Sequence, residues 1–408
     1  MVAYWPLLAS HQMNYRMKKS VFFVFALLCF SCSEKSVEIF SVSVQNTLDI
    51  DRAHETVEVD ISTIELNRKS LEVVNAKTNQ ILQSQIVDYD GKGATGSVLL
   101  FQPNIPANAE ATYKINLIPF EATDSTLIRC YSRFVPERTD DYAWENNRVA
   151  FRTFGPVAQK MVEDDIKGGT LTSGIDAWLK RVEYPIINKW YAKAVKEKGA
   201  YHKDNGEGLD NFHVGVSRGV GGIAIKTNSS YAVSKNFTVW ETITNGPIRT
   251  SFILDYEDWD AQGKKIKERK YISLDYGQNL TKYSVELNGT DRVSIGLTLH
   301  KNDGEITTNF TEGWMSYWEP FDDSELGQGV VLKNKKGLVA FDNYVTNKKD
   351  ESNVYVESNV SKVIEYYAGF GWKKSGYFKT KQEWNNYLSR FSKCLDNPLK
   401  VSIINASN

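Results

Sequence analysis

The stretch Val57-Glu58-Val59-Asp60-Ile61 alternates apolar and charged side chains, which is the period of a β-strand that buries one face. The alternation returns in Tyr113-Lys114-Ile115-Asn116-Leu117-Ile118, and runs of this kind begin at Val37 and are bounded by Asn, Asp, Gly or Pro. Because short strands bounded in this way build antiparallel sheets, residues 37–120 are predicted to form a small N-terminal β-sandwich.

A larger set of strands is predicted in the C-terminal half of the chain. From Gly219 onward, short runs rich in Thr, Val, Ile and Tyr return at intervals of about ten residues or more. Examples are Ile223–Ile225, Ile248–Tyr256, Lys282–Leu287 and Val293–Leu299. We therefore predict a mainly β fold, in which a large antiparallel β-sandwich domain over residues 121–408, resembling a super-sandwich, follows the small one.

The segment 157–198 departs from the strand pattern. Its apolar residues recur every three or four positions, the period of a helix face, and Pro185 divides it into two helical pieces. The recurring residues are Ile175, Trp178, Leu179, Val182, Ile186, Ile187, Trp190 and Tyr191. The large domain is therefore expected to carry a short helical insertion, and Glu383–Phe391 is expected to form a closing helix.

Composition and charge exclude several classes of protein. Of the 408 residues, 41% are apolar and 24% charged, which is a globular balance that argues against disorder and coiled coils. Lysine and arginine number 49 against 50 acidic residues, so no broad basic field exists for nucleic acid. The 12% of aromatic residues suits both a β scaffold and sugar-stacking surfaces.

The N-terminus resembles a bacterial lipoprotein signal. Met17-Lys18-Lys19 precedes an apolar run over Val21–Phe30, which is too short to cross a bilayer but suits a secretory signal. A small residue then precedes Cys32, as at a lipidation site. We therefore expect residues 1–32 to be a signal and anchor segment whose true start is Met17, with Cys32 lipidated. The protein is expected to be tethered to a cell-envelope membrane without spanning it.

The two other cysteines beyond this segment, Cys130 and Cys394, could form one disulfide or remain buried thiols. The sequence contains no zinc-type Cys/His spacing, no phosphate-binding loop and no nucleophile elbow. It gives no indication of the oligomeric state.

The densest group of titratable residues lies within Tyr201–His213, where glycines allow the backbone to turn sharply. The segment continues into Val214–Gly222, in which Arg218 offers a planar guanidinium for a carboxylate. A polar surface loop is one alternative interpretation, and a divalent cation site is another, although its spacing matches no recognised motif. The ligands of such a site would be His202, Asp204, Glu207 and His213.

A second cluster is Trp144–Arg152, which is predicted to be a strand. Arg148 and Arg152 are four residues apart and therefore share a face, where they could clamp an anionic sugar or pair with neighbouring acids. Aromatic runs over Gly313–Pro320 and Tyr366–Lys374 could stack on sugars or belong to the core.

Four blocks of the sequence resemble a known family: Trp144–Arg152, Ser173–Arg181, Tyr201–Asp210 and Gly369–Gly376. They are similar to secreted proteins and lipoproteins of polysaccharide-utilisation gene clusters in the Bacteroidota. The resemblance implies an oligosaccharide dehydratase of ulvan breakdown, which removes water from a terminal glucuronate or iduronate and leaves a 4,5-unsaturated uronate. Asn147 stands where the resemblance leads us to expect Asp.

The implied reaction needs a base, an acid and a cation that holds the uronate carboxylate. A neutral imidazole suits the base, and a phenol or a carboxyl of raised pKa suits the acid. No cofactor is required, although a divalent cation could share the work of the arginines. The candidates are His202 or His213 as base, Tyr201 or Glu207 as acid, and Arg218, Arg148 or Arg152 as clamp. Further substrate-binding candidates are Trp144, Lys180, Asp210 and Trp372.

Three rival functions remain open at this point. A non-catalytic glycan-binding lipoprotein would bind anionic oligosaccharides without turnover. A glycoside hydrolase would use two carboxylates about 5–10 Å apart, for which Glu145 with Asp210 or Glu207 are candidates. A sugar epimerase would use the same base and clamp without loss of the hydroxyl.

Overall fold

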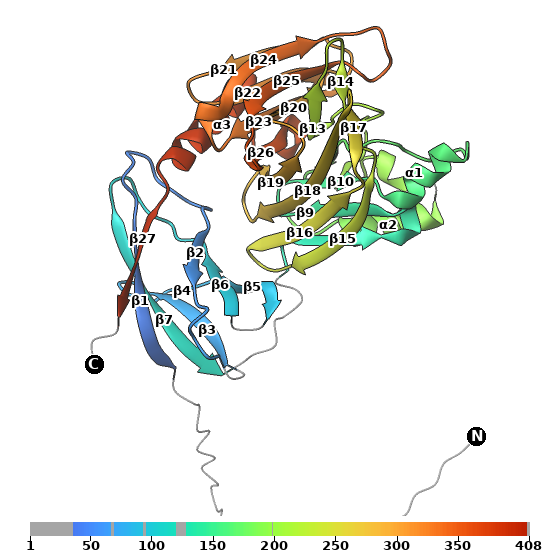
Figure 1. Cartoon of the computed structure of the whole chain (residues 1–408). Helices are drawn as coiled ribbons and strands as arrows, with labels where there is room; N and C mark the ends of the chain where they lie inside the picture. The colour runs from blue at the N-terminus through green and yellow to red at the C-terminus, as the bar shows by residue number, and fades with distance from the viewer. Residues whose placement is uncertain (1–35, 67–68, 93–94, 120–127, 198, 406–408) are drawn as a thin grey trace, which may run out of the picture. The chain divides into compact units, whose positions relative to one another are not determined.

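The computed structural model describes residues 36–66, 69–92, 95–119, 128–197 and 199–405 (Figure 1). Antiparallel strands dominate these residues and three α-helices accompany them, which confirms the predicted fold class. The predicted signal segment and Cys32 lie outside the described residues. None of the helices that the structure describes is long and apolar enough to cross a membrane.

The small sandwich consists of two antiparallel sheets (Figure 1). The order of the first is β27 (Lys400–Asn405), β1 (Val37–Gln45), β7 (Glu110–Pro119), β3 (Lys69–Asn75) and β4 (Ile81–Leu82). The order of the second is β2 (Val57–Asp60), β6 (Thr95–Phe101) and β5 (Ser84–Lys92). In β2 the expected alternation is observed, because Val57 and Val59 are buried while Glu58 and Asp60 are exposed.

The last strand of the chain belongs to this small sandwich. Strand β27 pairs antiparallel with β1, with Ser402 opposite Ser43. The small sandwich is therefore built from both ends of the described chain, which the expected division into residues 37–120 and 121–408 does not capture. Strand periodicity marks a buried face but not the partner that pairs with the strand.

The large domain contains three sheets among the described residues. The largest comprises β15 (Phe237–Thr244), β16 (Arg249–Tyr256), β18 (Lys264–Asp275), β19 (Leu280–Asn288), β26 (Val363–Trp372), β23 (Ser324–Leu332), β22 (Trp314–Phe321) and β21 (Glu305–Asn309), with β17 (Trp259–Ala261) paired to β18. The second comprises β14 (Tyr231–Ala232), β13 (Val220–Lys226), β20 (Arg292–Thr298), β25 (Asn353–Asn359) and β24 (Leu338–Tyr344). The third comprises β12 (Gly208–Leu209), β11 (Asp176–Lys180), β10 (Ala150–Thr153), β9 (Asp141–Glu145) and β8 (Tyr131–Val135).

The expected helical insertion is only partly helical. Helices α1 (Pro156–Glu163) and α2 (Ile187–Lys196) are separated by strand β11, which the helical spacing did not predict. All five residues of β11 are buried, and Ala177 and Leu179 pack in the main core while Trp178 packs in a separate core with α2. Because both faces of β11 are buried, its sequence lacks the alternation that identifies a half-buried strand.

The predicted closing helix is confirmed as α3 (Lys381–Asp396). Thr380 caps its first turn by accepting a hydrogen bond from the Glu383 amide at 3.2 Å. Trp384 and Leu388 are fully buried, and the Trp384 indole donates to the Gln328 carbonyl of β23 at 3.0 Å. The helix is thereby fixed to the largest sheet. Cys130 and Cys394 are both free thiols.

Candidate functional site

The segment 201–213 begins as a 3-10 turn over Ala200–His202 and then adds strand β12 to the edge of β11. This pairing requires a glycine at position 208, because its φ is +107° and a Cβ atom there would lie 1.9 Å from the Leu179 carbonyl oxygen. After β12, Asp210 contacts Arg152 of β10, and Asn211 donates to Asp322 in the turn between β22 and β23.

The first half of this segment borders a buried charge cluster that we call the Arg152 cluster: Arg152, Asp141, Asp176 and Asp210. The guanidinium lies 2.6 Å from Asp176, 2.8 Å from Asp210 and 3.6 Å from Asp141, measured to the nearest carboxylate oxygen. Burial raises the pKa of Asp141 to about 6, and it also raises the pKa of Asp176 and of Asp210. Arg152 thus faces three carboxyls that burial tends to keep protonated, and the positive charge of Arg138 also opposes the rise in the pKa of Asp141 and of Asp210.

Tyr201 and His202 lie at the edge of this cluster. The Tyr201 ring is buried and stacks on Trp178 with ring centroids 5.3 Å apart. The His202 side chain is 53% exposed, and its Nδ1 atom lies 3.7 Å from the Asp210 carboxylate and contacts the Asp210 carbonyl oxygen. His202 is therefore accessible to a ligand, whereas Arg152 is already occupied by carboxylates of the chain.

Glu207 faces away from the Arg152 cluster. Its carboxylate accepts a hydrogen bond from the Tyr184 hydroxyl at 2.5 Å and another from Lys189. Burial raises the pKa of Glu207, but the hydrogen bonds from Lys189 and Tyr184 outweigh burial and hold the pKa below its ordinary value. This environment favours the carboxylate form, which is the opposite of what a proton donor needs.

Four further predicted site residues are also buried within the protein: Arg218, Lys180, Trp144 and Trp372. Arg218 is 1% exposed and donates to the Ser173 hydroxyl and the Val216 carbonyl, both at 3.0 Å. The Lys180 ammonium is bound by the Glu145 carboxylate at 2.7 Å, and the side chain is wholly buried. The indole of Trp144 donates to the Thr281 hydroxyl, and Trp372 packs in the main core. These surroundings are typical of structural residues.

The strand predicted over Trp144–Arg152 is wrong in its middle, because the Asn146 side chain accepts hydrogen bonds from the Arg148 and Val149 amides and closes a turn between β9 and β10. Arg148 lies in this turn and does not share a strand face with Arg152. Its guanidinium covers the Tyr377 ring at 4.5 Å and donates to Asn279 at 3.2 Å. It lines a cavity between the small sandwich and the large domain. The Asn147 side chain is buried, and its oxygen accepts a hydrogen bond from the Gly277 amide at 2.8 Å. An amide thus anchors the 275–279 turn at this position.

The second half of the segment leads into a cavity of about 490 Å³, which we call the His300 cavity. Asn211 and His213 line it, together with His300 and Glu319 from the other side of the large domain. The remaining polar lining includes Asp322, Asp350, Lys301, Lys348 and Lys349.

His300 and Glu319 form a hydrogen-bonded pair in this cavity. The His300 Nδ1 atom lies 2.7 Å from the Glu319 carboxylate, which also accepts a hydrogen bond from Gln328 at 3.0 Å. Burial raises the pKa of Glu319, while the contact with His300 opposes the rise. The His300 Nε2 atom is shielded from solvent and has no hydrogen-bond partner within the described part of the chain.

The orientation of His300 is fixed by aromatic contacts. Phe212 meets the imidazole edge-on with ring centroids 4.6 Å apart, and Phe321 lies 5.2 Å away. A carboxylate that accepts the Nδ1 proton leaves the Nε2 lone pair free, which is the arrangement of a general base. His300 therefore has a carboxylate partner on Nδ1, a ring held by aromatic contacts, and an Nε2 atom without a hydrogen-bond partner in the described part of the chain.

A second histidine–carboxylate pair lines the same cavity. His213 Nε2 lies 2.9 Å from the Asp350 carboxylate, and the His213 side chain is 63% exposed. Lys301, Lys348 and Lys349 add positive charge to the lining. The cavity thus offers two imidazoles in different environments and cations for an anionic ligand.

Sequence reasoning missed His300 and Glu319. Neither lies in a recognised motif, and they are 19 residues apart with strand β21 between them. The available signals were the scarcity of histidine, of which the chain has five, and an acidic residue at the end of the aromatic run Gly313–Pro320.

The residues considered for a metal site have separate partners. His202 contacts Asp210, Glu207 contacts Lys189, and His213 contacts Asp350. Within the described ranges, no group of three or more metal-ligating side chains has a geometry that could hold a metal ion.

Comparisons with known proteins connect the chain to a family. The model of a family described as "Domain of unknown function (DUF4861)" matches residues 44–401. A protein of Formosa agariphila named "Uncharacterized protein P7" is 53% identical over 389 residues, which cover 94% of this chain and 98% of that protein. A solved structure of a protein in the glycosyl hydrolase family 38 from Enterococcus faecalis has a TM-score of 0.43 at 9% identity. That likeness covers 91% of this chain and 47% of the solved chain, so the chain spans about half of its length.

Proposed function

Since the chain belongs to the DUF4861 family, whose description assigns no activity, we propose its function from the site together with the activity that the resemblance of its four sequence blocks implies: a lyase that removes water from the terminal uronic acid of an anionic oligosaccharide. The substrate class is the ulvan type, with glucuronate or iduronate at the non-reducing end, and the product is a 4,5-unsaturated uronate. The observation that carries the proposal is the pair of histidine–carboxylate contacts in the lysine-rimmed His300 cavity.

In this mechanism His300 is the base. Nε2 is shielded in the free protein, so substrate binding has to open the cavity wall beside it. Its lone pair then takes the proton from C5 of the uronate, and the electron pair of the C–H bond moves into the C4–C5 bond. Glu319 accepts the Nδ1 hydrogen bond and stabilises the imidazolium that forms. The lysines neutralise the uronate carboxylate, which makes the C5 proton more acidic.

His213 is the acid in the same step. As an imidazolium paired with Asp350, it protonates the C4 hydroxyl, which leaves as water when the C4–O bond breaks. The base gains one proton and the acid loses one, so exchange with solvent restores both. The step balances without an oxidant, a reductant or a cofactor, and a divalent cation remains an optional addition to the lysines.

The test mixes the chain with oligosaccharides that end in glucuronate or iduronate and follows the ultraviolet absorbance of the conjugated carboxylate together with the product mass. We expect absorbance to rise with loss of one water and without chain cleavage. His300→Gln should lower kcat by about 100-fold or more, and Glu319→Gln should lower it by less. Absorbance with chain cleavage would identify a polysaccharide lyase instead.

His202→Gln is the informative comparison, because His202 is the base that the sequence predicts. If His202→Gln abolishes elimination while His300→Gln retains it, the reaction belongs to the edge of the Arg152 cluster. Binding without any turnover would sink the elimination mechanism and leave a glycan-binding protein.

We also propose that Cys32 carries a lipid anchor in the cell envelope, since the sequence before it resembles a lipoprotein signal. The membrane fraction of producing cells should contain the protein. Cys32→Ala should move it to the soluble fraction, and an unchanged distribution would contradict the anchor.

A further inference from the structure

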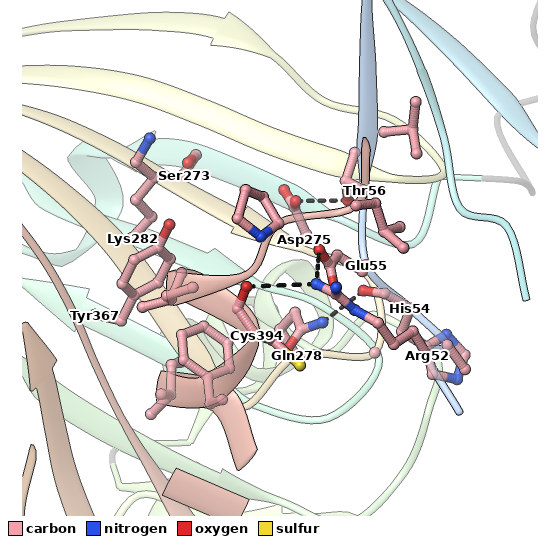
Figure 2. A pocket seen from close by; sticks show the side chains of 18 of the residues that line it. Arg52, His54, Glu55, Thr56, Ser273, Asp275, Gln278, Lys282, Tyr367 and Cys394 are labelled. Carbon is pink, nitrogen blue, oxygen red and sulfur yellow. Dashed lines mark hydrogen bonds and ion pairs between the residues drawn. The ribbon is translucent and has the colours of Figure 1, made fainter. Parts of the chain in front are cut away.

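A larger cavity, of about 670 Å³, lies between the small sandwich and the large domain (Figure 2). We call it the junction cavity. Figure 2 shows Arg52 and His54, from the small sandwich, on one side, and Lys282 and Tyr367, from the largest sheet, on the other. Its volume falls within the range of about 300–1,000 Å³ that is usual for ligand pockets. It shares no lining residue with the His300 cavity.

The walls of the junction cavity are joined by direct hydrogen bonds. The Thr56 hydroxyl donates to Asp275 at 2.7 Å, and Arg249 donates to Glu58 at 2.6 Å. Arg52 donates to the Asn397 carbonyl at 2.5 Å. These contacts connect the 52–58 segment to the large domain and to the end of α3, so the cavity is formed before any ligand arrives.

Positive charge dominates the lining. Its three carboxylates, Glu55, Glu58 and Asp275, are all held by Arg52 or Arg249. The lining contains four further cations, of which Lys282 pairs with a carboxylate outside the cavity. The other three, which form no ion pair with any residue that the structure describes, are Arg148, Lys333 and Arg390. Arg148 donates to the Asn279 side chain and Arg390 donates to the Asp51 carbonyl, so both keep their full charge for a ligand.

Aromatic side chains complete the lining. Tyr367 and Phe391 meet edge-on with ring centroids 4.9 Å apart, and Tyr387 lies beside Phe391. Aromatic faces beside cations and polar side chains suit a ligand that has both an apolar ring face and negative charge. Sugars that carry sulfate or carboxylate groups have this combination.

We propose that the junction cavity is a second binding site for an anionic saccharide, separate from the His300 cavity. The sulfate or carboxylate groups of the saccharide contact Arg148, Lys333 and Arg390, while a sugar ring packs on the tyrosines. The substrate class rests on the proposed function. The site itself rests on the charge and shape of the junction cavity.

The test measures binding by titration calorimetry at low salt with the full chain and a sulfated, uronate-containing oligosaccharide. The double variant Lys333→Gln/Arg390→Gln should raise Kd about tenfold, because it removes two exposed cations. Arg390 also donates to the Asp51 carbonyl across the walls, so Lys333→Gln alone, which removes no hydrogen bond between the walls, should raise Kd as well. Lys264→Gln, at an exposed lysine outside both cavities, is the matched control and should leave Kd unchanged. Equal Kd values for the double variant and the native chain would overturn the proposal.

Two further titrations distinguish a saccharide site from a free-anion site, and the junction cavity from the His300 cavity. Inorganic sulfate that binds as tightly as the oligosaccharide would identify a site for free anions and overturn the saccharide assignment. Repeating the titration in the His300→Gln background separates the two proposals. If no elimination is found but binding still depends on Lys333 and Arg390, the proposed function fails and the junction site stands. If elimination is found but binding is independent of those cations, only the junction site fails.

Discussion

Replacing Lys180 by Met removes the positive member of a wholly buried ion pair. The Lys180 ammonium donates to the Glu145 carboxylate at 2.7 Å, to the Asn146 carbonyl at 2.8 Å and to the Tyr184 carbonyl at 2.9 Å. Both charged side chains are 0% exposed. Met has a similar length and no charge, so the substitution deletes these three hydrogen bonds with little change in volume.

The expected cost is large because Glu145 stays buried without its counter-ion. Removal of one partner of a buried pair typically costs about 3–5 kcal/mol. Here the Glu145 carboxylate keeps hydrogen bonds from the amides of Ile186 and Ile187 at the start of α2, each at 2.9 Å. We therefore expect a loss of about 3 kcal/mol, which is a substantial part of a total stability of about 5–15 kcal/mol.

Urea unfolding followed by tryptophan fluorescence measures this loss. Lys196→Met, at an exposed position of α2, is the matched control and should change the free energy of unfolding by less than about 0.5 kcal/mol. The double variant Glu145→Gln/Lys180→Met should recover part of the loss, because it removes the unpaired charge. A loss below about 1 kcal/mol for Lys180→Met, together with a raised KM, would refute the structural role and favour the substrate contact that the sequence predicts.

Two further predictions concern the Arg152 cluster and the segment beside it. Because burial raises the pKa of Asp141 to about 6, above its ordinary value of 3.8, the folded chain binds this proton more tightly than the unfolded chain. The carboxyl therefore lowers stability as pH rises from about 4 to about 6, and Asp141→Asn should remove up to about 3 kcal/mol of that decline in urea unfolding. A decline of the same size in the variant would exclude Asp141 as its cause. Gly208→Ala should cost more than about 2 kcal/mol and speed proteolysis within 201–213, since its Cβ would collide with the Leu179 carbonyl. Gly206→Ala, with a φ of +95° but open space around the Cβ, should cost only about 1 kcal/mol, and equal costs would contradict the collision.

The mainly β class and the closing helix could be predicted from the amino-acid sequence, because both depend on periodicities that are local to the chain. Val57 and Val59 face the core, as their alternation with the exposed Glu58 and Asp60 predicts. The scarcity of histidine and the density of charge also directed attention to the segment 201–213. This segment borders both the Arg152 cluster and the His300 cavity, and the sequence pattern did not distinguish between them.

Burial of charge could not be predicted from the sequence. Arg218, Lys180 and Arg152 resemble ligand-binding cations in the sequence, yet the fold surrounds each of them with its own acceptors. The sequence around an arginine or a lysine is the same whether the counter-ion of its side chain comes from a substrate or from another strand. For Lys180 and Arg152 the packing of β9, β10 and β11 decides between the two, and for Arg218 the hydrogen bonds to Ser173 and Val216 do.

Strand β11 and the His300–Glu319 pair show the same limit in different ways. A strand that is buried on both faces loses its alternation, and therefore Ala177–Leu179 matched a helical spacing that the fold does not use. His300 meets Glu319, and Lys333 joins Arg148 and Arg390 around one cavity, only because distant strands and α3 are brought together. Local periodicity predicted the half-buried strands and the closing helix. Long-range pairing, which no local pattern encodes, decided which charges share a cavity.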